Sequence, residues 1–105
     1  MSNLEFAIEA DQVPQGKAAM VKIGDKFYAI CNDGGTFYAV DESCPHEGGH
    51  LAKGLVNDGC VVCPVHLWAW NLKTGQNSTG MKHLVLKTYP CQLRNGKVYI
   101  EVYGA

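Results

Sequence analysis

The sequence contains two short segments that each place a cysteine close to a histidine. The first reads CPH from Cys44 to His46, and the second reads CPVH from Cys63 to His66. Sixteen residues, 47–62, separate the two pairs. Side chains this far apart along the chain converge only where two loops meet at their tips, and adjacent hairpins of a β-sheet bring their turns side by side. The spacing therefore favours a β scaffold that carries both loops at one end.

The segments on either side of this region have the composition of β-strands. Valine, isoleucine, tyrosine and phenylalanine are frequent in them, and several segments alternate apolar and polar residues with a period of two. They are AAMVKI at 18–23, FYAIC at 27–31, TFYAV at 36–40 and KVYIEVY at 97–103. No long window keeps the apolar period of a helix.

Turn residues lie between these strand segments. They are Gly24-Asp25, residues 32–35 and Asn95-Gly96, and the last is the strongest signal because asparagine and glycine tolerate positive φ angles. We therefore expect hairpins at all three places. The prediction is an all-β, antiparallel fold in which residues 1–105 form a single domain.

The composition narrows the class of protein. A chain of 105 residues with 47% hydrophobic content suits one compact domain with a modest core. Its net charge is -1 and it has no run of basic residues, so we expect no nucleic acid and no membrane as a partner. The chain has no cationic, apolar leader. We therefore expect a soluble, cytoplasmic protein, whose five cysteines suit metal ligands or buried thiols better than a disulfide framework.

Two cysteines and two histidines can bind either of two kinds of metal centre. A tetrahedral zinc ion accepts two ligands of each type. Zinc modules commonly group cysteine with cysteine and histidine with histidine, whereas each segment here pairs one cysteine with one histidine. The mixed pairing lets each loop give a cysteine to one iron and a histidine to the other iron of a [2Fe-2S] cluster. The iron-sulfur centre is favoured, and structural zinc remains the alternative.

The motif resembles that of the Rieske [2Fe-2S] proteins, in which Cys-x-His is followed after a similar interval by Cys-x-x-His. The flanking residues Pro45, Gly48, Pro64 and Thr74-Gly75 agree as well. The resemblance covers essentially the whole chain. It implies a Rieske-type sandwich or barrel with a cluster-binding subdomain at one end.

The resemblance also implies the ligands and the loops that carry them. Cys44 and Cys63 would bind one iron, and His46 and His66 would bind the other, with one cluster per chain. The cluster-binding loops would span about 43–50 and 60–70, and a covering loop would span about 76–83.

Within the family, the sequence resembles a low-potential branch. Respiratory Rieske proteins have two further cysteines that join the loops by a disulfide, whereas this chain has Gly49 and Val65 at those positions. They also have hydroxyl donors to the cluster or its cysteine sulfur where this chain has Trp68 and Trp70. Because such hydrogen bonds stabilise the reduced cluster, we expect a potential near the low end of the Rieske range, about -150 mV.

The Rieske-type ferredoxins of bacterial multicomponent oxygenases lack both features, and CPVHLWAWNLKTG is similar to their second loop. The resemblance implies an electron-transfer protein, not an enzyme, that passes one electron from a flavoprotein reductase to a terminal oxygenase or similar enzyme as a monomer. The chain departs from the pattern at Leu67, where most relatives have glycine, and in 76–84, which lacks the usual proline. The small electron-transfer subunit of a nitrite reductase and a structural zinc domain are the alternative functions.

The remaining cysteines have simpler interpretations. Cys31 and Cys91 are expected to be small buried residues. Cys60 and Cys63 form a Cys-x-x-Cys pair, but no helix-opening context follows, so a redox dithiol is less favoured than an iron ligand at Cys63.

Other candidate side chains lie near the motif. His50 and His83 are expected at the surface or in satisfied hydrogen bonds rather than as ligands. Trp68 and Trp70 are two residues apart, so on a strand they would share a face, which we expect to be the core rather than an apolar partner surface. Nine of the ten acidic residues lie at or before Asp58, which we interpret as an ordinary solvated surface, with steering of a charged partner as the alternative.

Overall fold

The computed structural model describes residues 2–46, 48–65, 67–79 and 81–103. Its helical segments within these ranges are two short 3-10 helices, η1 (Ala10–Gln12) and η2 (Leu51–Lys53). The strands are β1 (Ser2–Glu9), β2 (Ala18–Ile23), β3 (Lys26–Asp33), β4 (Thr36–Asp41), β5 (Leu55–Asn57), β6 (Cys60–Val62), β7 (Ala69–Asn71), β8 (Thr88–Tyr89), β9 (Cys91–Arg94) and β10 (Lys97–Tyr103). In the described part of the chain, no helix has the length and apolar character needed to cross a membrane.

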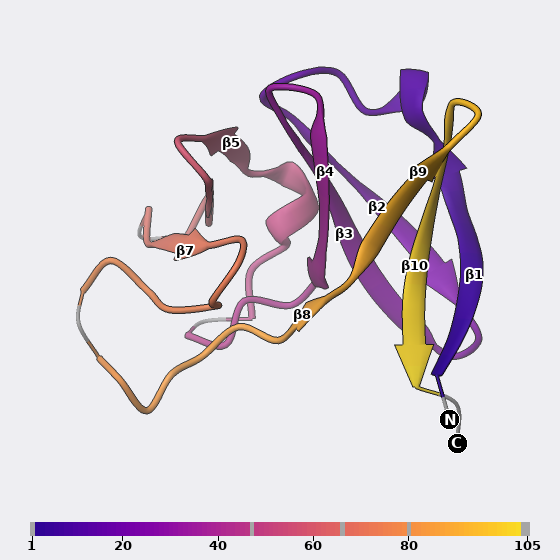
Figure 1. The fold of residues 1–105 in the computed structure, drawn as a ribbon. Helices are drawn as coiled ribbons and strands as arrows, with labels where there is room; N and C mark the ends of the chain where they lie inside the picture. Colours follow the sequence, from indigo (N-terminus) through magenta and orange to yellow (C-terminus); the bar gives the residue numbers. More distant parts are fainter. Residues whose placement is uncertain (1, 47, 66, 80, 104–105) are drawn as a thin grey trace.

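The strands form three sheets with antiparallel pairing throughout. The strand orders are β1-β10-β9, β2-β3-β4-β8 and β5-β6-β7. Figure 1 shows the first two sheets together on one side of the molecule, with the short third sheet on the other side. We call the first two sheets the barrel. The predicted all-β, antiparallel fold is confirmed.

The three predicted hairpins are present. Gly24 joins β2 to β3, Gly34 and Gly35 join β3 to β4, and Asn95 and Gly96 join β9 to β10. All five residues have positive φ angles, which glycine adopts without a steric penalty and asparagine tolerates better than most residues. The turn chemistry therefore determines where these strands reverse.

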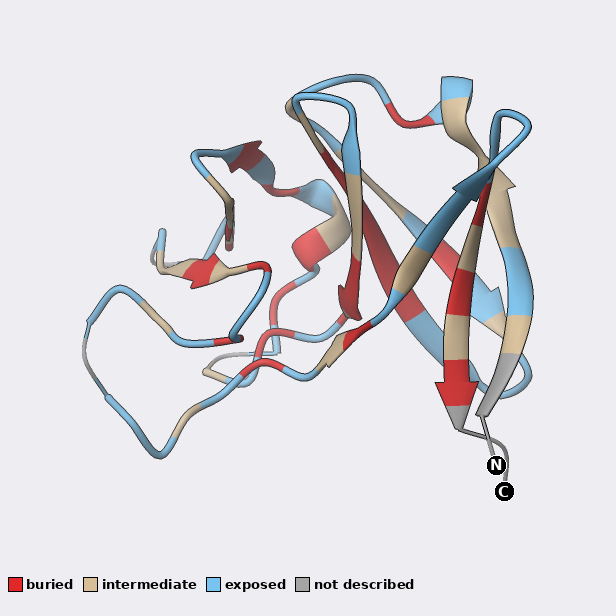
Figure 2. Ribbon diagram, in the orientation of Figure 1, coloured by how far each residue is buried: buried red, intermediate tan, exposed pale blue. Residues whose placement is uncertain are grey.

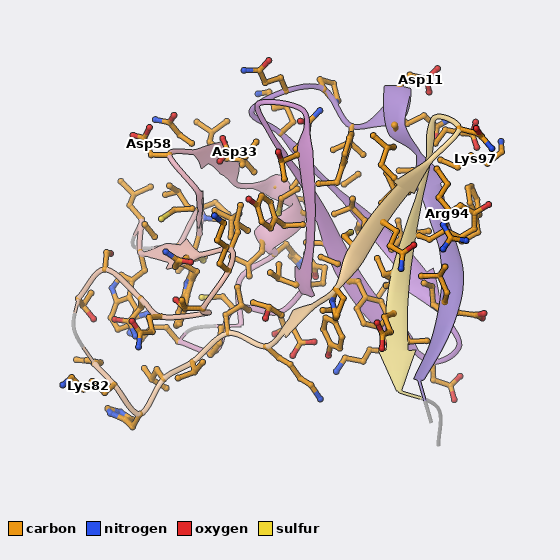
Figure 3. All side chains as sticks on the ribbon, in the orientation of Figure 1. Asp11, Asp33, Asp58, Lys82, Arg94 and Lys97 are labelled. Atoms are coloured by element: carbon orange, nitrogen blue, oxygen red, sulfur yellow. The ribbon has the colours of Figure 1, made fainter. Side chains whose placement is uncertain are left out.

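The sequence pattern does not predict a fourth hairpin, which joins β5 to β6. Asp58 and Gly59 form its turn with φ angles of 52° and 75°. Each strand is only three residues long, which is too short to show a period. The Gly59 N–H donates to Asp33 Oδ2 at 2.8 Å, so the hairpin is attached to the end of β3, and Figure 3 shows Asp33 and Asp58 at the same end of the molecule. Strand β1, which pairs with β10 along its length, is also absent from the sequence prediction.

Strand β3 is buried on both faces and separates two cores. Ala29 and Cys31 belong to one apolar cluster, whereas Tyr28 and Ile30 belong to the other. The first cluster also contains Val40, Cys44, Leu51, Val56, Val61, Cys63, Trp70, Leu72 and Leu86. The second also contains Val13, Val21, Ala39, Tyr89, Val98, Ile100 and Val102. In Figure 2 β3 is accordingly coloured as buried over most of its length, and it connects the barrel core to the core under the Cys/His loops.

The 42–87 segment leaves the barrel and returns to it at neighbouring points. It starts after Asp41, the last residue of β4, and ends before Thr88, the first residue of β8. Strands β4 and β8 pair, and the Asp41 N–H donates to the Lys87 carbonyl at 3.0 Å. Both Cys/His pairs and the third sheet lie within this segment. The β2-β3-β4-β8 sheet therefore holds both ends of the region that carries the candidate ligands.

A polar cluster stabilises the place where the segment departs. The Tyr89 hydroxyl donates to Asp41 Oδ1 at 2.6 Å, and Lys26 Nζ lies 3.1 Å from the same oxygen. The ammonium of Lys26 is also 5.4 Å from the centre of the Tyr89 ring. Burial, together with the hydrogen bond to Asp41, raises the pKa of Tyr89 to about 12, and the hydrogen bonds to Tyr89 and Asp41 raise the pKa of Lys26 above its usual range.

We predict that this cluster makes the fold sensitive to alkali. The folded-state pKa values of Tyr89 and Lys26 both lie above their unfolded values of about 10 and 10.4. Their contribution to stability is therefore complete below about pH 10 and decreases as the pH rises toward 12. Urea unfolding should give a midpoint that falls as the pH rises above about 8.5, because burial also raises the pKa values of Cys31 and Cys91 to about 12, and the part of the decline due to Tyr89 should appear above about pH 10. Tyr89→Phe should flatten the decline and Tyr99→Phe should not; an identical decline in both variants would contradict the assignment.

Candidate metal centre

The first loop, residues 43–50, is closed by its own backbone. The Cys44 N–H donates to the Gly49 carbonyl at 2.9 Å, and the Gly48 N–H donates to the Cys44 carbonyl at 2.8 Å. Gly48 has a φ of 71°, a value that few side chains tolerate. These contacts fix a tight turn in which Cys44 is only 2% exposed.

The second loop follows β6 and leads into β7. The Cys63 N–H donates to the Trp68 carbonyl at 2.8 Å, which closes the loop at its base. Leu67 has a φ of 57°, although it is not glycine. Cys63 is fully buried.

The two loops are in direct contact at Gly49. A Cβ atom at this position would lie 3.0 Å from Cys63 Sγ and 2.9 Å from Val65 Cγ2. Real Cβ atoms rarely approach other atoms so closely, so the absence of a side chain at Gly49 lets the loops approach this far without displacing Val65 or Cys63. Cys44 and Cys63 consequently belong to the same buried cluster.

The His46 side chain extends from the first loop to the second. Its ring stacks on Trp68 with the ring centres 3.7 Å apart and the planes 8° from parallel, and its Nδ1 atom is buried. The structure thus brings Cys44, His46 and Cys63 onto two loops that touch. His66, the fourth predicted ligand, lies outside the described residues. Within the described ranges, no group of three or more metal-binding side chains is close enough to hold an ion.

The segment that follows β7 is organised by Asn77, which the sequence analysis does not single out. Its Nδ2 group donates to the carbonyls of Met81 at 2.8 Å and Leu84 at 2.9 Å. Its Oδ1 atom accepts hydrogen bonds from the Thr79 N–H at 3.0 Å and the Thr79 hydroxyl at 2.6 Å. One amide side chain therefore cross-links the predicted covering loop, in which the usual proline is missing.

This loop is attached to the second Cys/His loop. Ser78 exchanges two hydrogen bonds with Ala69, one through its N–H and one through its hydroxyl. Leu84 packs against the buried cluster that contains both cysteines. At the base of the loop, a Cβ atom on Gly75 would lie 2.0 Å from the Leu86 carbonyl oxygen, so the Thr74-Gly75 motif allows the chain to cross close to itself. The covering loop therefore packs beside the candidate site.

Glu42 and His50 form a second polar contact that sequence analysis does not identify. Glu42 is only 6% exposed, its Oε1 atom lies 2.8 Å from His50 Nδ1, and its Oε2 atom accepts a hydrogen bond from the Ala52 N–H at 3.3 Å. The contact fastens the end of the first loop to η2. His50 is thus exposed and hydrogen-bonded, as expected for a histidine that is not a ligand, and His83 is exposed.

The other predicted core residues differ in burial. Cys31 is fully buried, but Cys91 is half-buried because it lies at the margin of the barrel core. Trp70 is fully buried, whereas Trp68 precedes β7 and is half-buried beside His46. Trp68 nevertheless packs against the buried cluster that contains Trp70, with the two ring centres 6.0 Å apart, so both indoles contact the core as expected and only Trp70 is enclosed by it.

The cysteines outside the motif are not set up as reactive thiols. Burial raises the pKa of Cys31 and of Cys91 to about 12. Burial and the nearby carboxylates of Asp58 and Asp33 raise the pKa of Cys60. A thiol with a raised pKa is a poor nucleophile. None of the five cysteines, all of which lie in the described residues, forms a disulfide.

Comparison with known proteins identifies the family. Residues 4–90 match the model of the Rieske [2Fe-2S] domain, and the chain therefore belongs to the Rieske family. The 3-phenylpropionate/cinnamic acid dioxygenase ferredoxin subunit of Escherichia coli K12 is 32% identical over 101 residues, which are 95% of this chain and 94% of the relative. The protein of the same name from Photorhabdus laumondii is 33% identical over 97% of this chain and 96% of the relative.

Solved structures share the fold. The ferredoxin of Sphingomonas yanoikuyae B1 superimposes with a TM-score of 0.84 at 24% identity, over 96% of this chain and all of that chain. A putative NADH-dependent nitrite reductase small subunit from Mycobacterium tuberculosis gives a TM-score of 0.87 at 20% identity, over 100% of this chain and 99% of that chain. The resemblance to Rieske-type ferredoxins that the sequence shows is thereby confirmed.

The family's cofactor is a [2Fe-2S] cluster, and the described residues fit it. The side chains of Cys44 and Cys63 are buried sulfur donors, and His46 Nδ1 is a buried nitrogen donor. Trp70 Nε1 is buried in the same region without a hydrogen-bond partner among the described residues, which is unusual for a buried N–H group. Soft sulfur and imidazole donors around a water-poor site suit iron and sulfide.

We predict that Gly49→Ala disrupts the centre without unfolding the barrel. The new methyl group would press on Cys63 Sγ and Val65, so the buried sulfur of Cys63 or the loop that carries it must shift. Overpacking of this kind costs about 1–3 kcal/mol. Iron content per chain, measured by colorimetric assay, should fall by more than half. Gly34→Ala is the control: alanine is strained at its φ of 63° but meets no neighbouring atom, so this variant should lose stability and keep its iron; equal iron content in both variants would contradict the prediction.

Proposed function

We propose that this protein is a Rieske-type ferredoxin that carries one electron at a time from a flavoprotein reductase to a terminal oxygenase or a similar enzyme. The observation that carries the proposal is the contact between two Cys/His loops, combined with relatives that are named as dioxygenase ferredoxin subunits and match the chain over nearly its whole length. One structural neighbour, 24% identical, comes from a complex of reduced oxygenase and oxidised ferredoxin in carbazole 1,9a-dioxygenase.

The ligand assignment forms part of the proposal. Cys44 and Cys63 hold one iron, and His46 and His66 hold the other. The cluster supplies reversible one-electron transfer when it is bound. The two cysteines keep water from the sulfur-bound iron because both are buried, and the indole of Trp68 fixes the orientation of the His46 ring.

The site is proposed to have a low reduction potential for its family. Gly49 and Val65 leave no disulfide between the loops, and Gly49 instead allows direct contact. In respiratory proteins two hydroxyl groups donate hydrogen bonds to the cluster or to a cysteine sulfur, whereas here Trp68 and Trp70 occupy those positions and pack in or against the buried apolar cluster. Since hydrogen bonds to sulfur favour the reduced cluster, the potential should lie near about -150 mV.

A nitrite reductase small subunit is the second candidate function. The fold agrees as well with the Mycobacterium tuberculosis protein as with the ferredoxins, and this supports the alternative at the level of architecture. The two differ in assembly. We propose a monomer in the reducing environment of the cytoplasm, which agrees with five cysteines that form no disulfide. A subunit would instead elute from gel filtration in a stable complex with a larger reductase chain.

The test of the proposed function is a reconstituted electron-transfer assay with matched cysteine variants. The purified protein should contain about two irons and two acid-labile sulfides, and it should link a flavoprotein reductase to the oxygenase encoded beside its gene. Cys63→Ser should lose the cluster and abolish turnover. Cys60→Ser should retain both, because Cys60 lies three residues away on β6 and is not a proposed ligand.

A colourless protein with one zinc ion per chain would contradict the proposed function and favour the structural zinc domain. A normally loaded cluster in Cys63→Ser would contradict the ligand assignment.

We further predict that His66→Cys lowers the reduction potential. A thiolate adds negative charge to the cluster, and this added negative charge disfavours uptake of a further electron. All-thiolate plant-type clusters lie near -400 mV, so one exchange should lower the potential by roughly 100 mV in protein-film voltammetry. His83→Cys serves as the control, since His83 is an exposed residue of the covering loop. A retained cluster with an unchanged potential in His66→Cys would remove His66 from the ligand set.

A further inference from the structure

Leu67 combines two features that a surface leucine seldom shows together. Its backbone has a φ of 57°, in the left-handed region that branched side chains avoid. Its side chain is 73% exposed, the largest value among the exposed large apolar residues of the described part. The leucine therefore neither packs in the core nor suits the conformation of its own backbone. Strain of this kind commonly occurs at functional sites.

Leu67 lies at the rim of an apolar groove. The groove has a volume of about 280 Å³ and is lined by Lys53, Gly54, Leu55, Val62, Pro64 and Leu67. Leu55 is also strongly exposed, at 57%. The groove thus adjoins the second loop, in which Pro64 and Leu67 lie on either side of the proposed ligand His66 in the sequence.

Exposed apolar side chains are concentrated at this end of the molecule. Nine large apolar residues are exposed in the described part, and five of them lie between residues 55 and 85. These five are Leu55, Val65, Leu67, Met81 and Val85. Contiguous exposed apolar surface commonly marks a site of protein contact.

Among the described residues that line the groove, the one charged group is the ammonium of Lys53 at the end of η2, and none is a carboxylate. A complementary protein surface would therefore present an aliphatic or aromatic side chain to the groove and a carboxylate to Lys53.

We propose that this groove, with Leu67 at its rim, is the docking site for the oxygenase that accepts the electron, and that it takes up an apolar side chain of that partner. The inference rests on the proposed function. Electron transfer requires the acceptor to approach the histidine-bound iron, and Leu67 follows the proposed ligand His66 directly in the sequence. The leucine supplies apolar contact area that glycine would lack, which gives a reason for a strained backbone at this position.

Matched alanine variants test the docking site. The probe is the oxygenase encoded beside this gene, with chemically reduced ferredoxin as the varied substrate. Leu67→Ala should raise the KM for the ferredoxin about tenfold, equivalent to about 1.4 kcal/mol, at unchanged kcat. Leu93→Ala should leave KM within about twofold. Leu93 is the control because it is a 52% exposed leucine on β9, the strand of Arg94, which Figure 3 shows on the side of the molecule opposite Lys82 of the covering loop.

Leu67→Gly separates docking from structure. Glycine has no steric penalty at positive φ, so the variant should keep its cluster, its reduction potential and a melting temperature no lower than that of the wild type, while its KM rises as in Leu67→Ala. Lys53→Glu should also raise KM, and the increase should be larger at low salt than at high salt because salt screens exposed charges.

Three results would overturn the proposal. One is an unchanged KM in Leu67→Ala, and another is an equal rise in Leu93→Ala. The third is a loss of the cluster or a lower melting temperature in Leu67→Gly, which would make Leu67 a structural residue. Failure of the proposed function is distinguishable, because the wild-type protein would then be reduced by dithionite and yet support no turnover of the oxygenase.

Discussion

The close approach of Gly49 to the sulfur of Cys63 is the contact on which the candidate site depends. Two segments that are irregular and far apart in sequence meet there with no side chain between them. The contact places both cysteine sulfurs in one buried cluster and allows the ring of His46 to lie flat on Trp68 of the other loop. With Val65 as its neighbour, a side chain at position 49 would press on Val65 Cγ2 and Cys63 Sγ, so this pair of loops would have to shift to keep the proposed ligands together.

Polar side chains supply the hydrogen bonds that regular structure would otherwise provide. Loop backbone carries N–H and C=O groups that must find partners when they are removed from water. Asn77 satisfies several of them in the covering loop, and Glu42 satisfies one at the start of η2 while it also binds His50. Strand β3 supports both regions by packing one face on the barrel core and the other on the core below the loops. An irregular site is in this way attached to a regular scaffold.

The parts that sequence predicts are those encoded locally. The ligand motif and the turn at Asn95-Gly96 are short patterns whose chemistry has one main interpretation, and the structure confirms that turn and brings the two loops together. Asn77 and Glu42 are not predicted because an asparagine or a glutamate becomes an organising residue only through the backbone groups that the fold places around it. Asp58-Gly59 is a recognisable turn sequence, but the strands on either side of it are three residues long, which is too short for an alternating pattern to indicate a hairpin.

The unequal burial of the two tryptophans shows a further limit. A period of two predicts a common face only if both residues belong to the strand, and β7 begins at Ala69, one residue after Trp68. Leu67, which has a positive φ, comes directly before Trp68, whose ring stacks on His46 of the first loop, and the glycine that most relatives have at this position is the only sequence signal for that φ. Interactions between loops therefore had to be seen in three dimensions.

The meeting of the two ends of the 42–87 segment has a consequence for how such proteins diverge. Its first and last residues adjoin Asp41 and Thr88 on paired strands, and one hydrogen bond from Asp41 to Lys87 spans the junction. A unit whose ends coincide can be exchanged between scaffolds, or inherited unchanged while its host acquires new additions, because its removal leaves the host strands in register. The barrel and the metal-binding unit can thus accumulate substitutions under separate selection. Strand β3 is the exception, because it packs on both cores and a substitution in one core there must be compatible with the other.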